Sequence, residues 1–355
     1  AILDDDSLSH PRLEFVCTVC EEVGMEGATG IDVSMLKGKK LLNMDSEEEG
    51  VMLASCAGGC RADVKLPVER ETVSGTKLTV SLSGLTGGHS GSEIDKGRGN
   101  ANILMSRLLR DASAPVAIAS IDGGRKDNAI PRECTAQIIV APGEAVAVKA
   151  SIEQAAAEIA EEFKASDPDL KLAVSEETDC SESAISAKDS ARVIALIEAL
   201  PNGIIRMSRE IDKLVETSLN LGVLKSDDAD VTLRYAVRSS VGVAKKSLKN
   251  QLVCIADAFA AEVTFEGDYP AWEYKKDSKL REDMVRIFEE MYGKKPTVEA
   301  IHAGVECGLL SGKIEGLDCI SMGPDMYDIH TTEERLSISS AKRSYEYILR
   351  VIACK

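Results

Sequence analysis

The sequence is poor in aromatic side chains and in histidine. Aromatic residues make up 4% of its 355 residues, with one tryptophan, and four histidines are present. No apolar run approaches the roughly 20 residues that a membrane-spanning helix needs. Basic residues are outnumbered by acidic ones, 42 to 59, so binding to nucleic acid or to an anionic membrane is not expected to be the main task. We therefore expect a soluble, cytoplasmic protein.

Ten cysteines are spread through the chain, which is typical of reduced thiols in a cytosolic protein. Cys17 and Cys20 stand in the segment 12–20, which is rich in β-forming residues and predicts a buried strand. Side chains three apart on a strand point to opposite faces, so these thiols cannot share a metal ion and are expected in the core. Cys56 and Cys60 lack a second pair at zinc-finger spacing and are expected to be structural as well.

Two predicted strands end in acidic residues. The segment 12–20 runs into Glu21 and Glu22, and the strand predicted at 40–44 is followed by Asp45. Sheets of α/β proteins bind ligands at the carboxyl ends of their strands. The side chains of Glu21 and Glu22 are expected to point in different directions, which suits one as a metal ligand and the other as a general base. The alternative is that both lie in a solvated turn without a role in catalysis.

The strand and helix patterns predict an α/β domain interrupted by an inserted α+β domain. We place the first part of the α/β domain at 1–61, the inserted domain at 62–268 and the second part of the α/β domain at 269–355. Strands are expected at 72–83, 115–121, 133–141, 169–176, 215–225, 229–238, 297–301 and 318–322. Helices are expected at 27–35, 100–110, 143–165, 187–199, 241–261, 278–292, 304–311 and 337–354.

Three of the four histidines lie in loops that are dense in glycine or acidic residues: His89 in GGHSG, His302 in EAIHAGVECG and His330 in GPDMYDIHTTEERL. A single histidine is more often structural than a ligand, but imidazole is also the commonest side-chain ligand and proton carrier near neutral pH. Oxygen and nitrogen ligands without paired thiols favour a hydrolytic zinc, manganese or cobalt site. A phosphate cradle at 97–99 is a weaker alternative, because its third glycine is missing.

Seven motifs follow one another along the chain: EEVGMEGA, NMDSEEEG, GLTGGHSGSEIDKGRGNAN, GGRKDNAIP, ETSLNLGV, HAGVECG and GPDMYDIHTTEERL. Together they resemble the aminoacyl-histidine (Xaa-His) dipeptidases of the M20 metallopeptidase family. The resemblance implies a di-zinc aminopeptidase-like catalytic domain with an inserted lid domain, hydrolysis of dipeptides such as carnosine, and a homodimer. Two alternatives remain: a binding protein that retains the lid fold without activity, and an amidohydrolase of the same family that acts on an acylated amino acid.

The resemblance also implies roles for individual residues. Glu21 corresponds to the general base and His89 to the residue that stabilises the oxyanion. The implied metal ligands, for two zinc ions or else manganese or cobalt, are Glu22, Asp45 and His330. The residues implied to hold the backbone and the free carboxylate of the dipeptide are Asn128, Arg238 and Gly304. Arginine suits a carboxylate because its guanidinium group binds both oxygens.

One part of the family pattern is missing. In the family, a His-x-Asp motif and a metal-bridging Asp lie upstream of the Glu-Glu pair, whereas the 20 residues before Glu21 contain neither. We therefore expect an N-terminally incomplete catalytic domain in which each metal ion keeps too few ligands for a closed site. Alone, this chain is expected to bind metal poorly and to be inactive.

Overall fold

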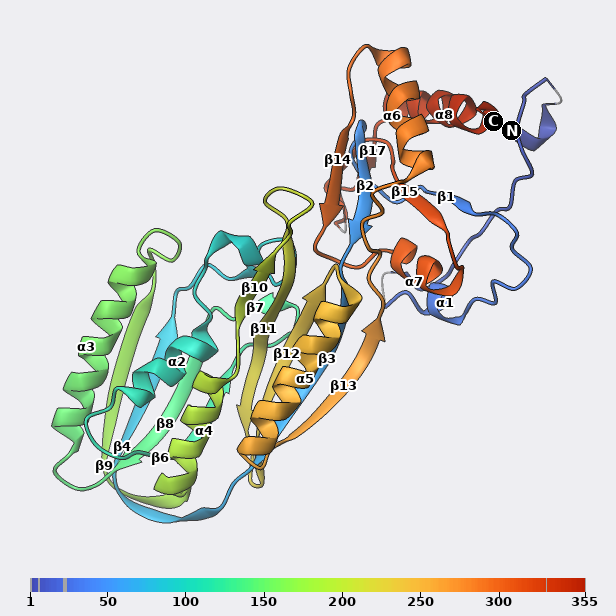
Figure 1. Ribbon diagram of the computed structural model, residues 1–355. Helices are drawn as coiled ribbons and strands as arrows, with labels where there is room; N and C mark the ends of the chain where they lie inside the picture. The colour runs from blue at the N-terminus through green and yellow to red at the C-terminus, as the bar shows by residue number, and fades with distance from the viewer. Residues whose placement is uncertain (1, 6, 22–23, 330, 355) are drawn as a thin grey trace.

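In a computed structural model, the chain forms two parts, each built around its own β-sheet (Figure 1). The structure describes residues 2–5, 7–21, 24–329 and 331–354. The larger part holds an antiparallel sheet of nine strands, in the order β13 (Glu262–Tyr269), β3 (Gly58–Pro67), β12 (Asp230–Ser239), β11 (Val215–Ser226), β6 (Ala117–Gly123), β8 (Cys134–Val140), β4 (Arg70–Ser83) and β9 (Lys171–Ile185), with β10 (Gly203–Met207) paired to β11.

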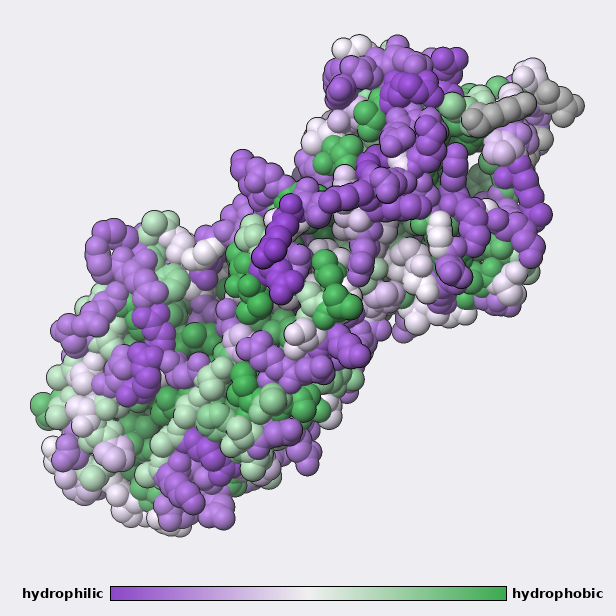
Figure 2. All heavy atoms as spheres, viewed as in Figure 1, coloured by the Kyte–Doolittle hydropathy of each residue, from purple (hydrophilic) through white to green (hydrophobic). Residues whose placement is uncertain are grey.

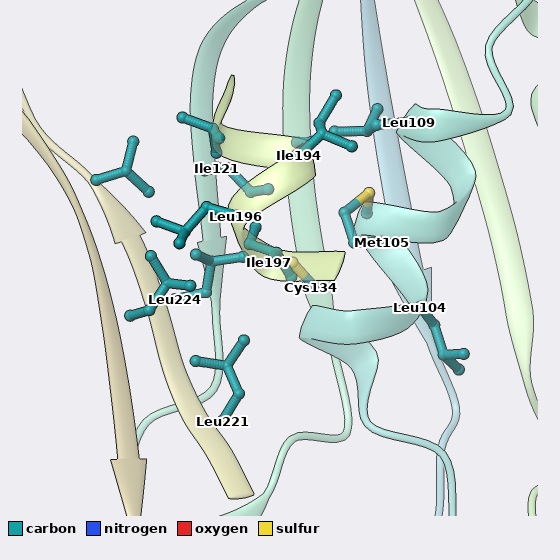
Figure 3. Close-up of a cluster of buried hydrophobic side chains, with 14 of the residues drawn as sticks. Leu104, Met105, Leu109, Ile121, Cys134, Ile194, Leu196, Ile197, Leu221 and Leu224 are labelled. Atoms are coloured by element: carbon teal, nitrogen blue, oxygen red, sulfur yellow. The ribbon is translucent and has the colours of Figure 1, made fainter. Parts of the chain in front are cut away.

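Helices cover one face of this sheet (Figure 1). They are α2 (Ala101–Arg110), α3 (Ala145–Phe163), α4 (Ala187–Ala199) and α5 (Gly242–Ala258). Apolar side chains recur along one side of α2 and α4, which allows both helices to bury that side against the sheet. Figure 3 shows the two helices over the sheet, where the apolar side chains that meet include Leu104, Met105, Ile121, Ile194 and Leu221. This core fixes the position of β11 and β12, which carry residues of the site.

The smaller part contains a mixed sheet in the order β1 (Lys40–Asn43), β15 (Asp318–Ser321), β2 (Val51–Cys56) and β14 (Thr297–Ile301). Its helices are α1 (Glu26–Gly30), α6 (Lys279–Tyr292), α7 (Glu306–Lys313) and α8 (Ile338–Ala353), and β16 (Met326–Tyr327) pairs with β17 (Arg335–Leu336). Phe288 of α6 and Tyr347 of α8 stack edge to face in the core between these helices and the sheet. Two further short strands, β5 (Gly88–His89) and β7 (Ala129–Ile130), pair with each other in the larger part.

The chain crosses between the two parts twice, and the crossings are hydrogen-bonded to each other. The first runs from β2 into β3, and the second leaves β13 and passes Trp272. The backbone N–H of Cys56 donates to the carbonyl of Trp272 (3.0 Å), and that of Trp272 donates to the carbonyl of Cys56 (3.1 Å). A two-stranded connection of this kind restricts twisting of one part against the other. The domain boundaries given above remain a prediction.

The predicted strand at 12–20 is wrong. None of these residues, all of which are described, is in a strand; Phe15 is 78% exposed, and Cys20 has a φ of 56°, outside the extended region. A strand needs a hydrogen-bonded neighbour for its backbone groups, and the segment pairs with no strand of the described sheets. Cys17 and Cys20 are consequently exposed instead of buried.

The other predicted strands and helices are present, with boundaries that differ by a few residues in most cases. The largest differences are the helix predicted at 27–35, which ends at Gly30 as α1, and the strand predicted at 169–176, which continues to Ile185 as β9. In the described part of the chain, no helix is both long and apolar enough to cross a membrane. Figure 2 shows hydrophilic side chains distributed over the visible face of both parts.

Candidate active site

Residues from both parts meet beside the two crossings. The hydroxyl of Ser218, on β11, lies 2.7 Å from Nε2 of His302, which follows β14 in the smaller part. Burial lowers the pKa of His302 to about 3, and electrostatic interactions with Arg238 and then with His89 add to this effect. Arg238 on β12 and His89 on β5 therefore lie within electrostatic reach of His302. His302 itself is 6% exposed, and its Nδ1 is buried without a hydrogen-bond partner among the described residues.

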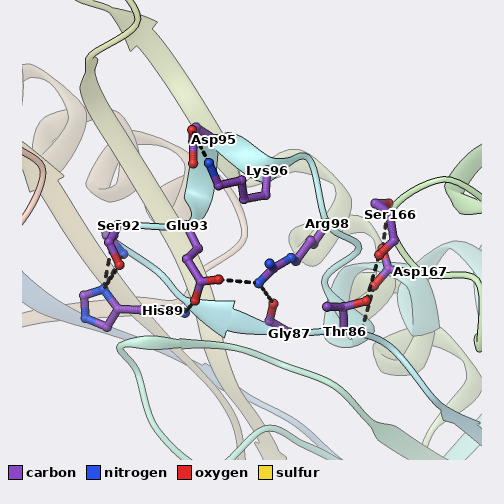
Figure 4. Close-up of polar contacts among 11 residues, drawn as sticks. Thr86, Gly87, His89, Ser92, Glu93, Asp95, Lys96, Arg98, Ser166 and Asp167 are labelled. Atoms are coloured by element: carbon purple, nitrogen blue, oxygen red, sulfur yellow. Dashed lines mark hydrogen bonds and ion pairs between the residues drawn. The ribbon is translucent and has the colours of Figure 1, made fainter. Parts of the chain in front are cut away.

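His89 is oriented by its own loop (Figure 4). Its Nδ1 accepts hydrogen bonds from the backbone N–H groups of Gly91 and Ser92, both at 3.2 Å. Because a backbone N–H can only donate, Nδ1 is the unprotonated nitrogen of the neutral ring, and Nε2 carries the proton. Burial lowers the pKa of His89, and the charge of Arg238 lowers it further, against an opposing effect of Glu93. His89 is thus a neutral hydrogen-bond donor near pH 7.

The loop that carries His89 is anchored at both ends (Figure 4). Glu93 accepts a hydrogen bond from the backbone N–H of His89 (2.8 Å) and forms an ion pair with Arg98, whose Nη1 donates to its carboxylate (2.8 Å). The buried carboxylate of Asp167 accepts from the backbone N–H groups of Thr86 and Gly99, each at 2.8 Å. These contacts hold a glycine-rich segment in one conformation, which is a requirement for a precisely placed donor.

Arg238 and Asn128 line one cavity of about 290 Å³, together with Asp127 and Tyr269. Nη1 of Arg238 donates to the hydroxyl of Tyr269 (3.4 Å), whereas its Nε is buried and has no hydrogen-bond partner among the described residues. A buried guanidinium N–H without a partner favours an anionic ligand, because an unmet donor costs about 1–3 kcal/mol. The carbonyl of Asn128 accepts from the backbone N–H of Ser90 (2.8 Å), so this cavity adjoins the His89 loop.

Gly304 packs closely against Tyr269 of the cavity and against Met25 of the turn that begins at Glu21. A Cβ atom at position 304 would lie 2.8 Å from Cε2 of Tyr269 and 3.1 Å from Cε of Met25, so glycine is needed for this close packing. Met25 belongs to the turn that begins at Glu21, whose carbonyl accepts from the N–H groups of Gly24 (3.1 Å) and Met25 (3.0 Å). Glu21 therefore lies in a turn and not at the end of a strand.

The predicted metal ligands are only partly described. Glu22 and His330 lie outside the described residues. Asp45 is exposed and follows β1. It lies near Cys307 of α7, since its charge is among the causes that raise the pKa of the Cys307 thiol, after a hydrogen bond to Cys319 and burial. Across the described ranges, no group of three or more His, Cys, Asp or Glu side chains is placed to hold a metal ion. The described residues alone do not fit a complete metal site.

Sequence reasoning did not assign roles to Tyr269, Ser218 or Glu93. Ser218 lies in the motif ETSLNLGV, which contributes to the family resemblance but does not indicate a function for this serine. Glu93 is four residues after His89 and bonds back to its N–H, a pattern related to the capping of helix starts that could have been recognised. Tyr269 carries no local signal, because its contacts with Arg238 and Gly304 depend on the fold.

Comparisons with known proteins extend over both parts. The family model of the M20 peptidase dimerisation domain matches residues 80–167. The chain is 34% identical over 344 residues to the cytosol non-specific dipeptidase of Escherichia coli (strain K12), which covers 96% of this chain and 71% of that protein. The structure is similar to the crystal structure of aminoacylhistidine dipeptidase from Vibrio alginolyticus, with a TM-score of 0.91 and 32% identity over 99% of this chain and 72% of that chain.

Proposed function

Because the chain belongs to the M20 family of metallopeptidases and the two relatives described above are dipeptidases, we propose that it acts on dipeptides that end in histidine, such as carnosine. The observation that carries this proposal is Arg238, which lines a cavity next to the His89 loop and whose buried Nε has no hydrogen-bond partner among the described residues. A guanidinium at this place suits the free carboxylate of a substrate whose scissile bond lies one residue away.

The roles that we propose for the side chains follow from their chemistry. Arg238 binds the terminal carboxylate, while Asn128 and Gly304 line the path of the substrate backbone. His89, neutral and with its proton on Nε2, donates to the oxyanion that develops on the scissile carbonyl. Glu21 acts as the general base, which takes a proton from the attacking water and returns it to the leaving amine.

The family uses divalent metal ions, and we propose zinc for this chain, with manganese or cobalt as alternatives. Its proposed ligands are Glu22, Asp45 and His330. Since the described residues do not assemble this set, no step of the reaction is assigned to the ion.

We also propose that the chain forms a homodimer and works in the cytoplasm. The match to a peptidase dimerisation domain at residues 80–167 supports the first proposal, and the cytosolic location in the name of the Escherichia coli relative supports the second. Sedimentation of the purified chain tests the first: a single species with the mass of one chain over the micromolar range would contradict it.

The decisive test is whether binding depends on the terminal carboxylate. We expect isothermal titration to show binding of Ala-His and carnosine and at least tenfold weaker binding of Ala-His amide, because the amide cannot pair with Arg238. The affinity of His89→Gln for Ala-His is compared with the affinity of the control variant His10→Gln, since His10 is exposed and lies outside the site. Equal affinity for the acid and the amide would refute the carboxylate clamp, by which we mean the binding of the terminal carboxylate by Arg238.

A hydrolysis assay with added zinc or manganese separates the remaining possibilities. Cleavage of Ala-His would show activity and contradict the expectation that this chain is inactive alone, whereas binding without cleavage agrees with that expectation. Cleavage of N-acetyl-histidine in place of Ala-His would identify an amidohydrolase of acylated amino acids. Failure to bind either compound would favour a protein that retains the fold for another binding task.

A further inference from the structure

Asp127 presents a carboxylate to the cavity that contains Arg238. It is half-buried, and its Oδ1 accepts a hydrogen bond from the backbone N–H of Asn128 (3.0 Å). In the described part of the chain, no side chain or backbone group bonds to its Oδ2. One oxygen of this carboxylate is therefore available to a ligand in the cavity.

The backbone of Asp127 is fixed by β11 and not by its own exposed turn. The amide of Asn220, which is 1% exposed, donates to the carbonyls of Asp127 (3.1 Å) and Ala129 (2.8 Å). Gly222 allows the turn to approach the strand, because a Cβ atom there would lie 2.5 Å from Cα of Asp127. The position of this carboxylate is thus set by buried contacts of the larger sheet.

The charges that line the cavity point to the kind of ligand. Arg61 and Glu266 form an ion pair with each other. Arg238 and Asp127 remain, one positive and one negative. A dipeptide with a neutral C-terminal side chain offers its carboxylate to Arg238 but no donor to Oδ2 of Asp127, whose nearby Arg234 is already paired with Asp63. A dipeptide with a basic C-terminal side chain offers a carboxylate to Arg238 and a charged donor to Oδ2 of Asp127.

We propose that Asp127 is a specificity-determining residue, which binds the basic side chain of the C-terminal residue of the substrate through its Oδ2. This inference rests on the proposed function, because it takes the carboxylate of the dipeptide to be held by Arg238. It extends the substrate class from histidine to lysine and arginine, whose side chains also donate from a basic nitrogen. Dipeptides with an acidic C-terminal side chain are disfavoured by repulsion from Asp127.

The test compares Asp127→Asn with the wild-type chain. The asparagine oxygen still accepts from the N–H of Asn128, so the turn is kept while the charge is removed. Affinities for Ala-His, Ala-Lys and Ala-Leu are measured by titration, and kcat/KM is measured as well where the chain with added zinc or manganese is active. Asp228→Asn serves as the matched control, because Asp228 is exposed in the turn that joins β11 to β12.

We expect the wild-type chain to bind Ala-Lys and Ala-His more tightly than Ala-Leu. In Asp127→Asn the preference for Ala-Lys over Ala-Leu falls roughly tenfold or more, as for the loss of a hydrogen bond between charged groups, and the affinity for Ala-Leu changes by less than about twofold. An unchanged preference, or an equal loss in Asp228→Asn, overturns the inference and leaves the proposed function in place. A wild-type chain that binds none of the three dipeptides overturns both.

Discussion

Replacement of His302 by glutamine is expected to make the stability of the protein less sensitive to acid. In the folded chain, burial above all lowers the pKa of His302 from 6.5 to about 3, with Arg238 and His89 adding to the shift. The folded state therefore binds fewer protons at this site than the unfolded state does. The neutral ring contributes full stability above pH 6.5, and this stability is lost progressively as the pH falls from 6.5 toward 3.

The size of the effect follows from the two pKa values. Between pH 7.5 and pH 5, the difference in proton binding at His302 lowers the free energy of unfolding by about 2 kcal/mol. His302 is 6% exposed, so screening by solvent reduces this value little. In His302→Gln the side chain no longer titrates, although its amide can still donate to the hydroxyl of Ser218. The variant should lack this part of the pH dependence, whatever its stability at pH 7.5.

Urea unfolding at the two pH values measures the difference. Trp272, the one tryptophan of the sequence, is buried at the second crossing and provides a fluorescence signal from the junction of the two parts. We expect the wild-type chain to lose about 2 kcal/mol more than His302→Gln between pH 7.5 and pH 5. The control is His10→Gln, which should behave as the wild type does, since His10 is exposed. An equal loss in the wild-type chain and in His302→Gln would refute the reasoning.

Three other substitutions test the packing and the clamp. Gly91→Ala places a Cβ atom 2.6 Å from the carbonyl oxygen of His302, and the strain should lower the free energy of unfolding by about 1–3 kcal/mol in the same urea assay. Arg238→Lys should weaken Ala-His binding about tenfold in a titration, because an ammonium cannot bind both carboxylate oxygens in the guanidinium geometry. Leu104→Ala removes a side chain from the core of the larger part and should cost about 2–5 kcal/mol of unfolding free energy without changing the affinity for Ala-His.

Helices with local signals at both ends could be predicted from the sequence. The helix expected at 278–292 is α6, which begins after Ser278, whose hydroxyl accepts from the N–H of Arg281, and ends at Gly293 with a positive φ. The segment 12–20 shows the opposite case. Its composition favours a strand, but composition supplies no neighbouring strand, and without one the segment stays irregular.

The same distinction applies to the site. The motif around His89 draws attention to that residue, because few histidines are present and this one lies between glycines. The tautomer of its ring depends on N–H groups whose direction only the folded loop reveals. Tyr269 approaches Arg238 and Gly304 from a different strand, and no spacing in the sequence connects these three positions.

The clamp and the oxyanion donor are coupled through charge. The guanidinium of Arg238 is one of the causes that lower the pKa of His89. A substrate carboxylate bound to Arg238 offsets that positive charge, which removes part of the shift and raises the pKa of His89 toward its ordinary value. This pKa describes the uptake of a second proton at Nδ1, which already accepts from the N–H groups of Gly91 and Ser92, so the ring stays neutral near pH 7 and keeps its proton on Nε2. Binding of the terminal carboxylate therefore changes the pKa of His89 without changing the tautomer that donates to the oxyanion, because that tautomer is fixed by the backbone of its own loop.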